Sequence, residues 1–541
     1  MRPMQRMAPA AWGLLGAAFA LVALVVYSPA LDGDWIGDDL GYVVNNAYIH
    51  HLDARSVLAL FDPLGDAALF TANYAPVHNL AHALEWRLFG ANTAGYHRVN
   101  VLLHALTSLL LAALFLAWGI PRTAALLLAA VFLVHPANVE AVAWIFQLKT
   151  ILALGFSLGA LLAFARRPVL SLALLALALL SKFSAAYALP VLAVRLWVRG
   201  ERERRAWAWL GAWAALVVAC ALPEFLAFER LGHAATLERY SDGFEQLRSI
   251  VAIGGRYLVM AATSWGVAAG HEPAPASSLL DPWWLFGLVA LGALGARMLA
   301  TLRARREEGA WWTWAAASFA PISQVFVFLY PMADRYLYFI LPGLLGGAFL
   351  AGRDALETLA PRLGERLAPR RMGRAAAVAG AALVALLAVR SFERAPVWRS
   401  EASALADAAR HYSDGIGALF LRARNAAAVG DRAAATAALG ALAERGFDGF
   451  MAVQQDPVFA PLARSPGYRE ALARMARHWI SEAGRRTRHV QPELRTMALA
   501  WLVLGERARA LEAYEAALAR GGPLDDVIRA EAQALRAAGD S

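Results

Sequence analysis

Long apolar runs separated by short charged segments occupy residues 10–391. Each run approaches the length of about 20 residues that an α-helix needs to cross a bilayer. The pattern predicts an all-α fold that begins with a polytopic transmembrane helix bundle of about 11–12 spans. The expected spans lie at roughly 10–30, 98–118, 122–135, 139–165, 168–181, 184–198, 206–228, 282–301, 310–330, 336–351 and 375–391.

Two stretches depart from this apolar pattern. Residues 31–97 are much more polar, include the adjacent acids Asp38 and Asp39, and are predicted to form a long extracytoplasmic loop with short interfacial helices. Residues 251–269 are moderately apolar but contain Arg256. The arginine distribution favours a re-entrant or interfacial helix there over a full crossing, unless the span boundaries in this part differ.

The last part of the chain, residues 392–541, interleaves charged and apolar positions and is predicted to be a soluble helical domain distinct from the membrane domain 1–391. Its small and large residues alternate as in tetratricopeptide (TPR) repeats, where small residues let paired helices approach. A generic array of helical hairpins explains the same pattern, so both interpretations stay open. The TPR-like positions are Gly430, Ala435, Leu439, Leu442, Trp501, Gly505, Ala510, Tyr514 and Ala517.

Composition and charge narrow the class of protein. Apolar residues make up 59% of the 541 and charged residues 17%, against about 45–50% and about 25% in soluble domains. This excess excludes a disordered chain, a fibrous protein and an ordinary cytosolic enzyme. The net charge of +9 lies mostly between spans, where membrane topology explains it, so no nucleic-acid partner is expected. The single cysteine, Cys220, excludes an intramolecular disulfide.

The arginine clusters also predict an orientation. Positive charge collects on the cytoplasmic side of membrane proteins. With the N-terminus in the cytoplasm, the clusters at 166–167, 199–205 and 303–306 fall inside if residues 251–269 do not cross. The acidic loop and the C-terminal domain are then both expected on the outer face.

A few ionisable residues near membrane depth are the candidates for chemistry, because such groups are costly there unless they serve a site. Asp38 and Asp39 are catalytic candidates. A neighbouring carboxylate and burial both raise a carboxylate pKa, which suits a general base. Lys182 and Arg335 lie at the predicted outer boundary, and Lys149 lies inside the fourth predicted span. Together these cations are typical of a site for a phosphate head group.

Further polar residues at the ends of neighbouring spans are expected to support this site. Glu140 and Trp144 are predicted to share one helix face, with Lys149 roughly one turn further along. A structural ion pair, or a lysine that snorkels to the interface, explains these residues equally well. The supporting candidates are Asn100, His104, His135, Glu140 and Trp144.

No metal site is predicted, because no cluster of His, Asp or Glu has metal-ligand spacing. A divalent cation at Asp38 and Asp39 stays open, since few oxygen ligands are visible. No Walker motif, glycine-rich phosphate loop or Ser-His-Asp signature is present in the sequence.

Several short motifs follow one another in a characteristic order. They are Trp35–Asp39, Val44–Asn46, Tyr74–Val77, Tyr96–His104, His135–Trp144, Ser181–Lys182 and Asp334–Tyr338. This order, followed by the TPR-like tail, resembles the GT-C superfamily of membrane glycosyltransferases. The resemblance is greatest to the transmembrane-and-TPR O-mannosyltransferase-like proteins and their bacterial relatives, and it covers nearly the whole chain.

The resemblance implies a multi-pass enzyme of the bacterial inner membrane that takes a sugar, with mannose as one candidate, from a polyprenyl-phosphate carrier. An acid of the first outer loop, here Asp38 or Asp39, would activate the acceptor hydroxyl. The mechanism that we favour is a transfer that inverts the anomeric centre. The tail would present a protein acceptor through Ser or Thr, with an envelope glycan as the other acceptor class. No cofactor is implied, and the other expected partners are membrane lipids.

Two positions depart from the pattern of this family. Ala75 stands where an arginine often follows the tyrosine, which puts one phosphate contact in question. Phe183 stands where an acidic residue often follows Ser-Lys, which points to altered donor recognition or another role.

Two other functions are compatible with the sequence. The tail could scaffold an envelope assembly with the spans as an anchor, although one span would suffice for anchoring. A transporter of lipid-linked saccharides is the other, and internal inverted repeats would favour it.

Overall fold

The computed structural model describes residues 8–71, 73–230, 239–327, 330–363, 369–486 and 488–538. Within these ranges the chain is helical and contains no strand, which confirms the predicted all-α fold. Two compact units are present. The first comprises Met1–Asp39, Leu88–Ala221 and Glu238–Glu401, and the second comprises Leu40–Arg87, Leu222–Leu237 and Ala402–Ser541. The functional domains 1–391 and 392–541 stay a prediction.

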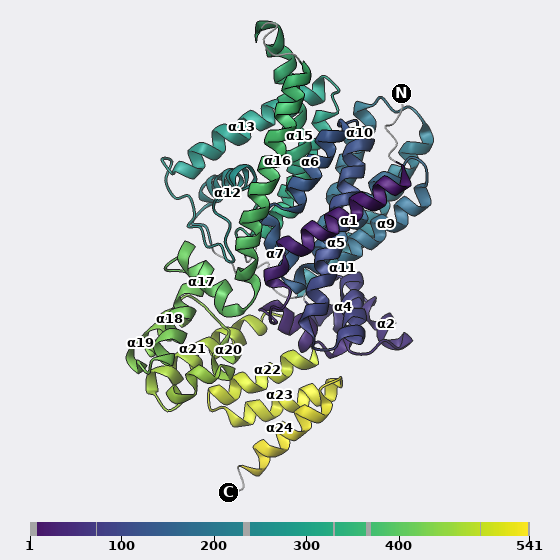
Figure 1. Ribbon diagram of the computed structural model, residues 1–541. Coiled ribbons are helices and arrows are strands. Elements are labelled where there is room, and N and C mark those ends of the chain that lie inside the picture. Colours follow the sequence, from purple (N-terminus) through teal and green to yellow (C-terminus); the bar gives the residue numbers. More distant parts are fainter. Residues whose placement is uncertain are drawn as a thin grey trace. The chain divides into compact units, whose positions relative to one another are not determined.

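Long helices packed along one another build the first unit (Figure 1). They are α1 (Pro9–Val26), α5 (Thr93–Ala117), α6 (Arg122–Leu133), α7 (Val139–Ala143), α8 (Leu148–Ala163), α9 (Pro168–Ser181), α10 (Ala188–Val198), α11 (Arg204–Arg230), α12 (Gly243–Thr263), α13 (Pro282–Arg303), α14 (Glu308–Phe319), α15 (Leu337–Leu363) and α16 (Pro369–Arg394). The end of α11 belongs to the second unit.

Seven helices among the described residues are long and apolar enough to cross a membrane, and the bent pair Arg122–Leu133 and Pro136–Ala143 makes an eighth if it counts as one span. These helices indicate a multi-pass membrane protein. Helix α12 is not among them. Some predicted spans are shorter than expected. Helix α14 ends at Phe319 and does not extend to residue 330, since the backbone before Pro321 disfavours helix.

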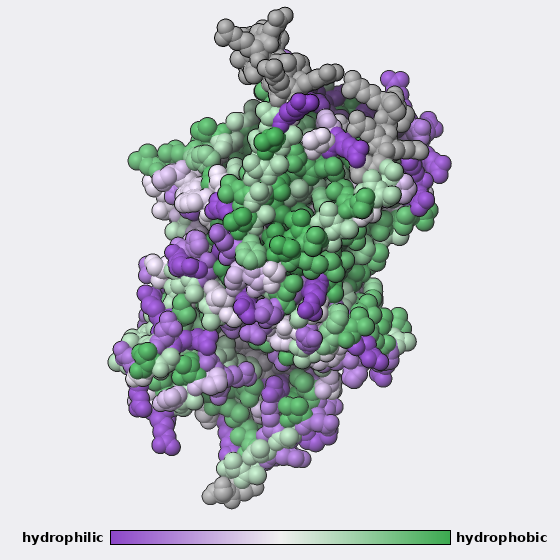
Figure 2. Space-filling model, in the orientation of Figure 1, coloured by the Kyte–Doolittle hydropathy of each residue, from purple (hydrophilic) through white to green (hydrophobic). Residues whose placement is uncertain are grey.

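Burial differs strongly between these helices. In the apolar window of Ile145–Ala163, 72% of the residues are buried, but only 6% are buried in Arg204–Leu226. Helix α8 is therefore central, while α11 turns its apolar side chains outward, as a lipid-facing helix does. Figure 2 shows broad apolar surface over the long helices.

Glycines allow α15 to pack closely against α14. A Cβ atom on Gly343 would lie 2.5 Å from the backbone nitrogen of Ala315, and one on Gly346 would lie 2.4 Å from Cδ2 of Trp311. Small residues at such contacts are a general way for membrane helices to associate, because lipid offers little hydrophobic drive between helices.

Replacing Gly343 by Ala should destabilise the protein by about 1–3 kcal/mol, because the added methyl group meets backbone that cannot move independently. The thermal midpoint of the purified protein in detergent measures this effect. Gly352→Ala is the matched control, since it lies on the same helix and its Cβ would meet nothing within 4 Å. Equal midpoints for the two variants would contradict the proposed close packing.

The second unit contains the first polar loop and the C-terminal helices. Its helices are α2 (Ala54–Leu60), α3 (Asp66–Phe70), α4 (Pro76–Phe89), α17 (Glu401–His411), α18 (Ile416–Ala428), α19 (Arg432–Glu444), α20 (Phe450–Gln455), α21 (Pro466–Ala483), α22 (Gln491–Val503), α23 (Arg507–Arg520) and α24 (Asp525–Ala537). Figure 1 shows α22, α23 and α24 side by side, in yellow.

The positions that suggested TPR repeats serve as turns and core residues of these C-terminal helices. Gly430 and Gly505 follow α18 and α22 with φ of +81° and +78°, a left-handed conformation that ends a helix readily at glycine. Most of the predicted small and large positions inside the helices are buried, namely Ala435, Leu439, Leu442, Ala510, Tyr514 and Ala517, whereas Trp501 is half-buried. The assignment to TPR repeats, rather than to generic helical hairpins, stays a prediction.

Ion pairs join the first loop to the C-terminal helices inside the second unit. Asp66 accepts hydrogen bonds from Arg520 and, at 3.4 Å, from Arg488. Arg488 also donates to the carbonyl oxygen of Leu64 at 2.9 Å. The loop segment and the tail are thus held as one compact body by residues more than 400 positions apart.

Candidate functional site

The side chain of Asp39 is buried and is held by hydrogen bonds from backbone amides of the first unit. Its side chain is 1% exposed. One carboxylate oxygen accepts a hydrogen bond from the amide of Ile36 at 2.9 Å, and the other accepts one from the amide of Phe146 at 2.8 Å. Burial raises the pKa of Asp39 to about 8, the negative charge of Asp38 adds to this rise, and the two amides oppose it. Asp39 therefore fixes the loop after α1 against residues 144–147.

Asp38 is half-buried and has a different environment. Gly37, with φ of +51°, turns the backbone immediately before the two acids. Burial raises the pKa of Asp38, while the positive charges of Lys149 and Arg335 oppose that rise. Lys149 and Arg335 thus act electrostatically on Asp38. The two acids therefore differ, because backbone amides hold Asp39 whereas Asp38 lies near positive charge.

The helix predicted over 139–165 is broken at Trp144. Helix α7 ends at Ala143, Trp144 is extended with φ of −84° and ψ of 119°, and α8 begins at Leu148 after the short helix η5 (Ile145–Gln147). The predicted shared face of Glu140, Trp144 and Lys149 is therefore wrong.

A side chain from another helix stabilises this break. The amide nitrogen of Asn100 on α5 donates to the carbonyl oxygens of Trp144 and Ile145 at 3.1 and 3.3 Å. These carbonyls lose their regular helical partners once the chain turns. The indole nitrogen of Trp144 donates to the carbonyl of Ile36 at 3.0 Å. The break thus receives the acidic loop, and Asn100 and Trp144 position it.

Glu140 and Arg335 form a buried ion pair. Glu140 is 1% exposed. One of its oxygens accepts from the backbone nitrogen of Arg335 at 2.7 Å, and the other accepts from the guanidinium. The guanidinium carbon also lies 5.5 Å from the ring centre of Trp144 and 5.2 Å from that of Tyr330. The contact fixes η9 (Asp334–Tyr336) against α7.

The two lysines extend this positive region. The ammonium of Lys149 lies 3.8 Å from the ring centre of Phe146. The ammonium of Lys182, at the start of η6 (Phe183–Tyr187), donates to the hydroxyl of Thr150 at 3.0 Å. Lys182 also interacts electrostatically with Lys149, Arg335 and Glu140. All three predicted cations therefore interact electrostatically with one another around Glu140, and basic side chains gathered in this way are typical of phosphate sites.

The two histidines have structural contacts. His104 on α5 is fully buried, with one ring nitrogen 2.8 Å from the hydroxyl of Tyr338 and the other 2.9 Å from the carbonyl oxygen of Leu133. His135 accepts from the amide of Ala137 and lies 3.1 Å from the carbonyl of Ala261. These contacts occupy both rings, so they hold helices in place.

Some members of the site were not singled out from the sequence. Thr150 is an ordinary hydroxyl inside an apolar run, and only its contact with Lys182 reveals it. Asp334 accepts from the backbone nitrogen of Ala268 at 3.1 Å and lies 2.7 Å from His271. These contacts of Asp334 hold the backbone next to Arg335 in place. The only indication of Asp334 in the sequence was its position in a motif beside Arg335. Trp398 stacks on Trp144 with 5.3 Å between ring centres, and no sequence pattern indicated it.

Within the described ranges, no group of three or more His, Cys, Asp or Glu side chains is arranged to hold a metal ion. The acidic pair contributes only two such residues, and both oxygens of Asp39 already accept backbone hydrogen bonds.

The chain is similar to a protein O-mannosyl-transferase of Caenorhabditis elegans. The two are 29% identical over 174 residues, which is 30% of this chain and 24% of that protein. The match thus spans about a quarter of the relative's own length. No protein-family profile and no solved structure matches the chain. Together with the apolar helices, the similarity supports a glycosyltransferase-like membrane protein in general.

Proposed function

We propose that this protein is an integral membrane glycosyltransferase that moves a sugar from a polyprenyl-phosphate carrier to an acceptor hydroxyl at the outer face of a bacterial inner membrane. The observation that carries the proposal is the cluster of Asp38 with Lys149, Lys182 and the Glu140–Arg335 pair. It combines a carboxylate that can take a proton with cations that can bind phosphate. The similarity to a protein O-mannosyl-transferase supports the same class.

Asp38 is the proposed general base. A base needs an oxygen that can reach the acceptor hydroxyl, and both oxygens of Asp39 are occupied by backbone amides. Asp38 removes the acceptor proton as the oxygen attacks the anomeric carbon on the face opposite the phosphate. The new glycosidic bond forms as the bond to the carrier breaks, so the anomeric centre inverts.

The cations stabilise the departing phosphate. Negative charge develops on the carrier phosphate as the bond breaks, and preorganised positive charge is worth most in a site that excludes water. Arg335 is committed to Glu140, whereas Lys182 donates to the neutral hydroxyl of Thr150. Lys182 is therefore the proposed principal phosphate ligand, Lys149 adds positive charge that acts on Asp38, and Arg335 contributes through its orientation.

The proposed orientation puts the N-terminus in the cytoplasm and the acidic loop and C-terminal helices outside. The lipid tail of the carrier then stays in the bilayer while its head group enters the site. The C-terminal helices would select the acceptor, which is a protein hydroxyl or an envelope glycan.

The experiment is direct transfer by the full-length protein in liposomes. Purified protein with radiolabelled polyprenyl-phosphate mannose, or polyprenyl-phosphate glucose, should release the free polyprenyl phosphate. No release from any such donor, or full activity in Asp38→Asn/Asp39→Asn, would contradict the proposal. A scaffold protein would tolerate this double substitution, and a transporter would move the donor without releasing the carrier.

The pH dependence of transfer should respond to Lys149. Asp38 acts as a base only as a carboxylate, so kcat/KM should rise with pH through its pKa. Lys149 helps to hold that pKa down. Lys149→Met removes this positive charge, the pKa rises further, and the acidic limb of the profile should move to higher pH.

Lys182→Met is the matched control for this shift, because Lys182 is not among the charges that act on Asp38. It should weaken donor binding and raise KM without moving the acidic limb. An equal shift of the acidic limb in both variants, or no shift in Lys149→Met, would contradict the proposal that Asp38 is the general base.

A further inference from the structure

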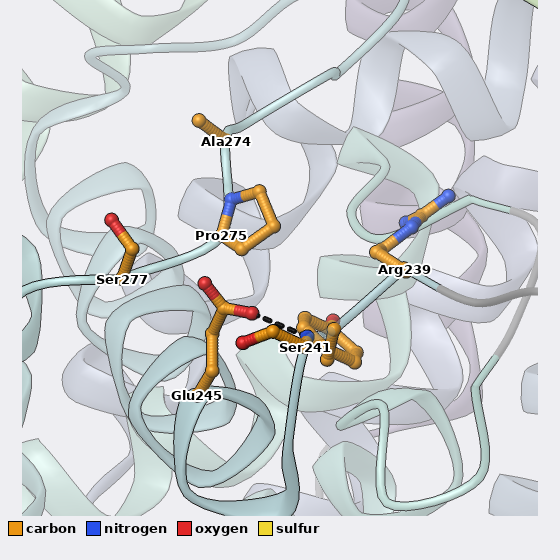
Figure 3. A pocket seen from close by; sticks show the side chains of 7 residues that line it. Arg239, Ser241, Glu245, Ala274, Pro275 and Ser277 are labelled. Carbon is orange, nitrogen blue, oxygen red and sulfur yellow. Dashed lines mark hydrogen bonds between the residues drawn. The ribbon is translucent and has the colours of Figure 1, made fainter.

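A cavity of 780 Å³ lies beside the first turn of α12 (Figure 3), and its lining residues do not come from the acidic loop. Its volume falls in the range of about 300–1,000 Å³ that is usual for small-molecule sites. The lining comes from the residues that precede and begin α12 and from the segment 274–277. The side chains relevant to binding are Arg239, Tyr240, Ser241, Glu245, Pro275 and Ser277.

The wall formed by residues 274–277 is held in place by α12. Arg248 is buried and donates to the carbonyl oxygens of Ala276 and Ser277 at 2.7 and 3.0 Å. The hydroxyl of Ser249 accepts from the backbone nitrogen of Ala276 at 2.9 Å. A wall fixed by three such bonds loses little freedom when a ligand binds, which lowers the cost of binding.

Glu245 provides an oriented carboxylate. It is 8% exposed, and one oxygen accepts from the backbone nitrogen of Ser241 at 2.6 Å. Hydrogen bonds from Ser241 lower the pKa of Glu245, so it is ionised at neutral pH. Figure 3 shows the other carboxylate oxygen turned toward Pro275 and the cavity.

The lining suits one chemical class of ligand. It combines a carboxylate acceptor, a guanidinium donor and the hydroxyls of Ser241 and Ser277, and it adds the rings of Tyr240 and Pro275. The opposite charges of Glu245 and Arg239 offer no excess that would select an anion. Sugars present adjacent hydroxyls that both donate and accept, together with a C–H face that packs on rings. We propose that this cavity binds a neutral saccharide unit, outside the transfer site.

The wall of the cavity is continuous with the candidate transfer site. The segment that forms it passes Ala268 and His271, and both contact Asp334, next to Arg335. A saccharide held here would be coupled to the transfer site through a short stretch of chain. This coupling rests on the proposed function, whereas binding of the saccharide does not.

The test is direct binding to the full-length protein in lipid nanodiscs, because detergents with sugar head groups would occupy the cavity. The probes are α-mannobiose, cellobiose and chitobiose, titrated by saturation-transfer NMR. At least one should bind. Glu245→Gln should weaken its affinity about tenfold, since it replaces a charged hydrogen-bond acceptor. Ser277→Trp, which fills the cavity from an exposed position, should abolish binding.

Ser278→Ala is the matched control, because Ser278 adjoins Ser277 and does not line the cavity. It should bind as the unaltered protein does. Binding of none of the three disaccharides, or binding unaffected by Ser277→Trp, overturns the proposal. So does binding of only a capped Ala-Thr-Ser-Ala peptide or of inorganic phosphate. Asp38→Asn should lose transfer and keep disaccharide binding, so failure of this inference is distinguishable from failure of the proposed function.

Discussion

Replacing Asp38 by Asn should lower kcat for sugar transfer by about 10²–10⁴-fold, the usual contribution of a general base. The change removes the proton acceptor but keeps the size and most of the polarity of the side chain. Because Asp38 is half-buried and approached by Lys149 and Arg335 rather than by backbone amides, the fold should be unaffected. Release of radiolabelled polyprenyl phosphate measures the rate, and the thermal midpoint reports on the fold.

Asp39→Asn separates catalysis from positioning. The amide side chain that it introduces has one carbonyl oxygen for the two backbone amides that Asp39 now satisfies, so one buried N–H faces an NH₂ group. Leaving one such group unsatisfied costs about 1–3 kcal/mol, and the midpoint should fall. Asp34→Asn, at an exposed acid of the same loop, should change neither quantity. If Asp39→Asn lost activity with an unchanged midpoint while Asp38→Asn stayed active, the two roles would be reversed.

Replacing Glu140 by Leu should destabilise the protein by about 3–5 kcal/mol, because it leaves the guanidinium of Arg335 in a buried site without its carboxylate. The expected result is a large fall in the thermal midpoint and loss of transfer. Glu140→Leu/Arg335→Met should recover most of the stability, since a buried ion pair is often replaceable by apolar side chains of similar volume. The double variant should remain largely inactive, because the positive charge of Arg335 no longer acts on Asp38, even though Lys149 and Lys182 are still present.

This double variant distinguishes a purely structural ion pair from a functional one. A structural pair would regain activity together with stability. Asp32→Asn is the control, because Asp32 pairs with Arg399 at 2.6 Å on an exposed part of the surface, where such pairs contribute little. A fall in midpoint after Asp32→Asn as large as that after Glu140→Leu would show that burial does not decide the cost.

Periodicity and composition predicted the helical, multi-pass part of the fold because apolar runs are local features. The exact span ends depended on contacts that the runs do not encode. The break at Trp144 needs the side chain of Asn100, which lies 44 positions earlier. Without it, the pattern over residues 139–165 indicates one helix, and Glu140, Trp144 and Lys149 were expected on one face.

The candidate site was only partly predictable for the same reason. The sequence indicated Asp38 and Asp39 together, but the amide of Phe146, which occupies Asp39, is 107 positions away. Lys149, Lys182 and Arg335 were expected as a group, yet the pairing of Arg335 with Glu140 joins residues 195 positions apart. Which cation is neutralised and which acid is accessible are properties of these distant contacts.

The ion pairs between Asp66 and the arginines of the tail have a consequence for biogenesis. Asp66 and Arg488 are separated by 422 positions, and synthesis at roughly 5–20 residues per second therefore delivers Arg488 about 20–85 s after Asp66. During that interval the segment around Asp66 has nothing from the tail to pair with. The second unit is completed only after Arg488 has been synthesised, so a chain that stops before Arg488 carries an unfinished loop that quality-control proteases can recognise.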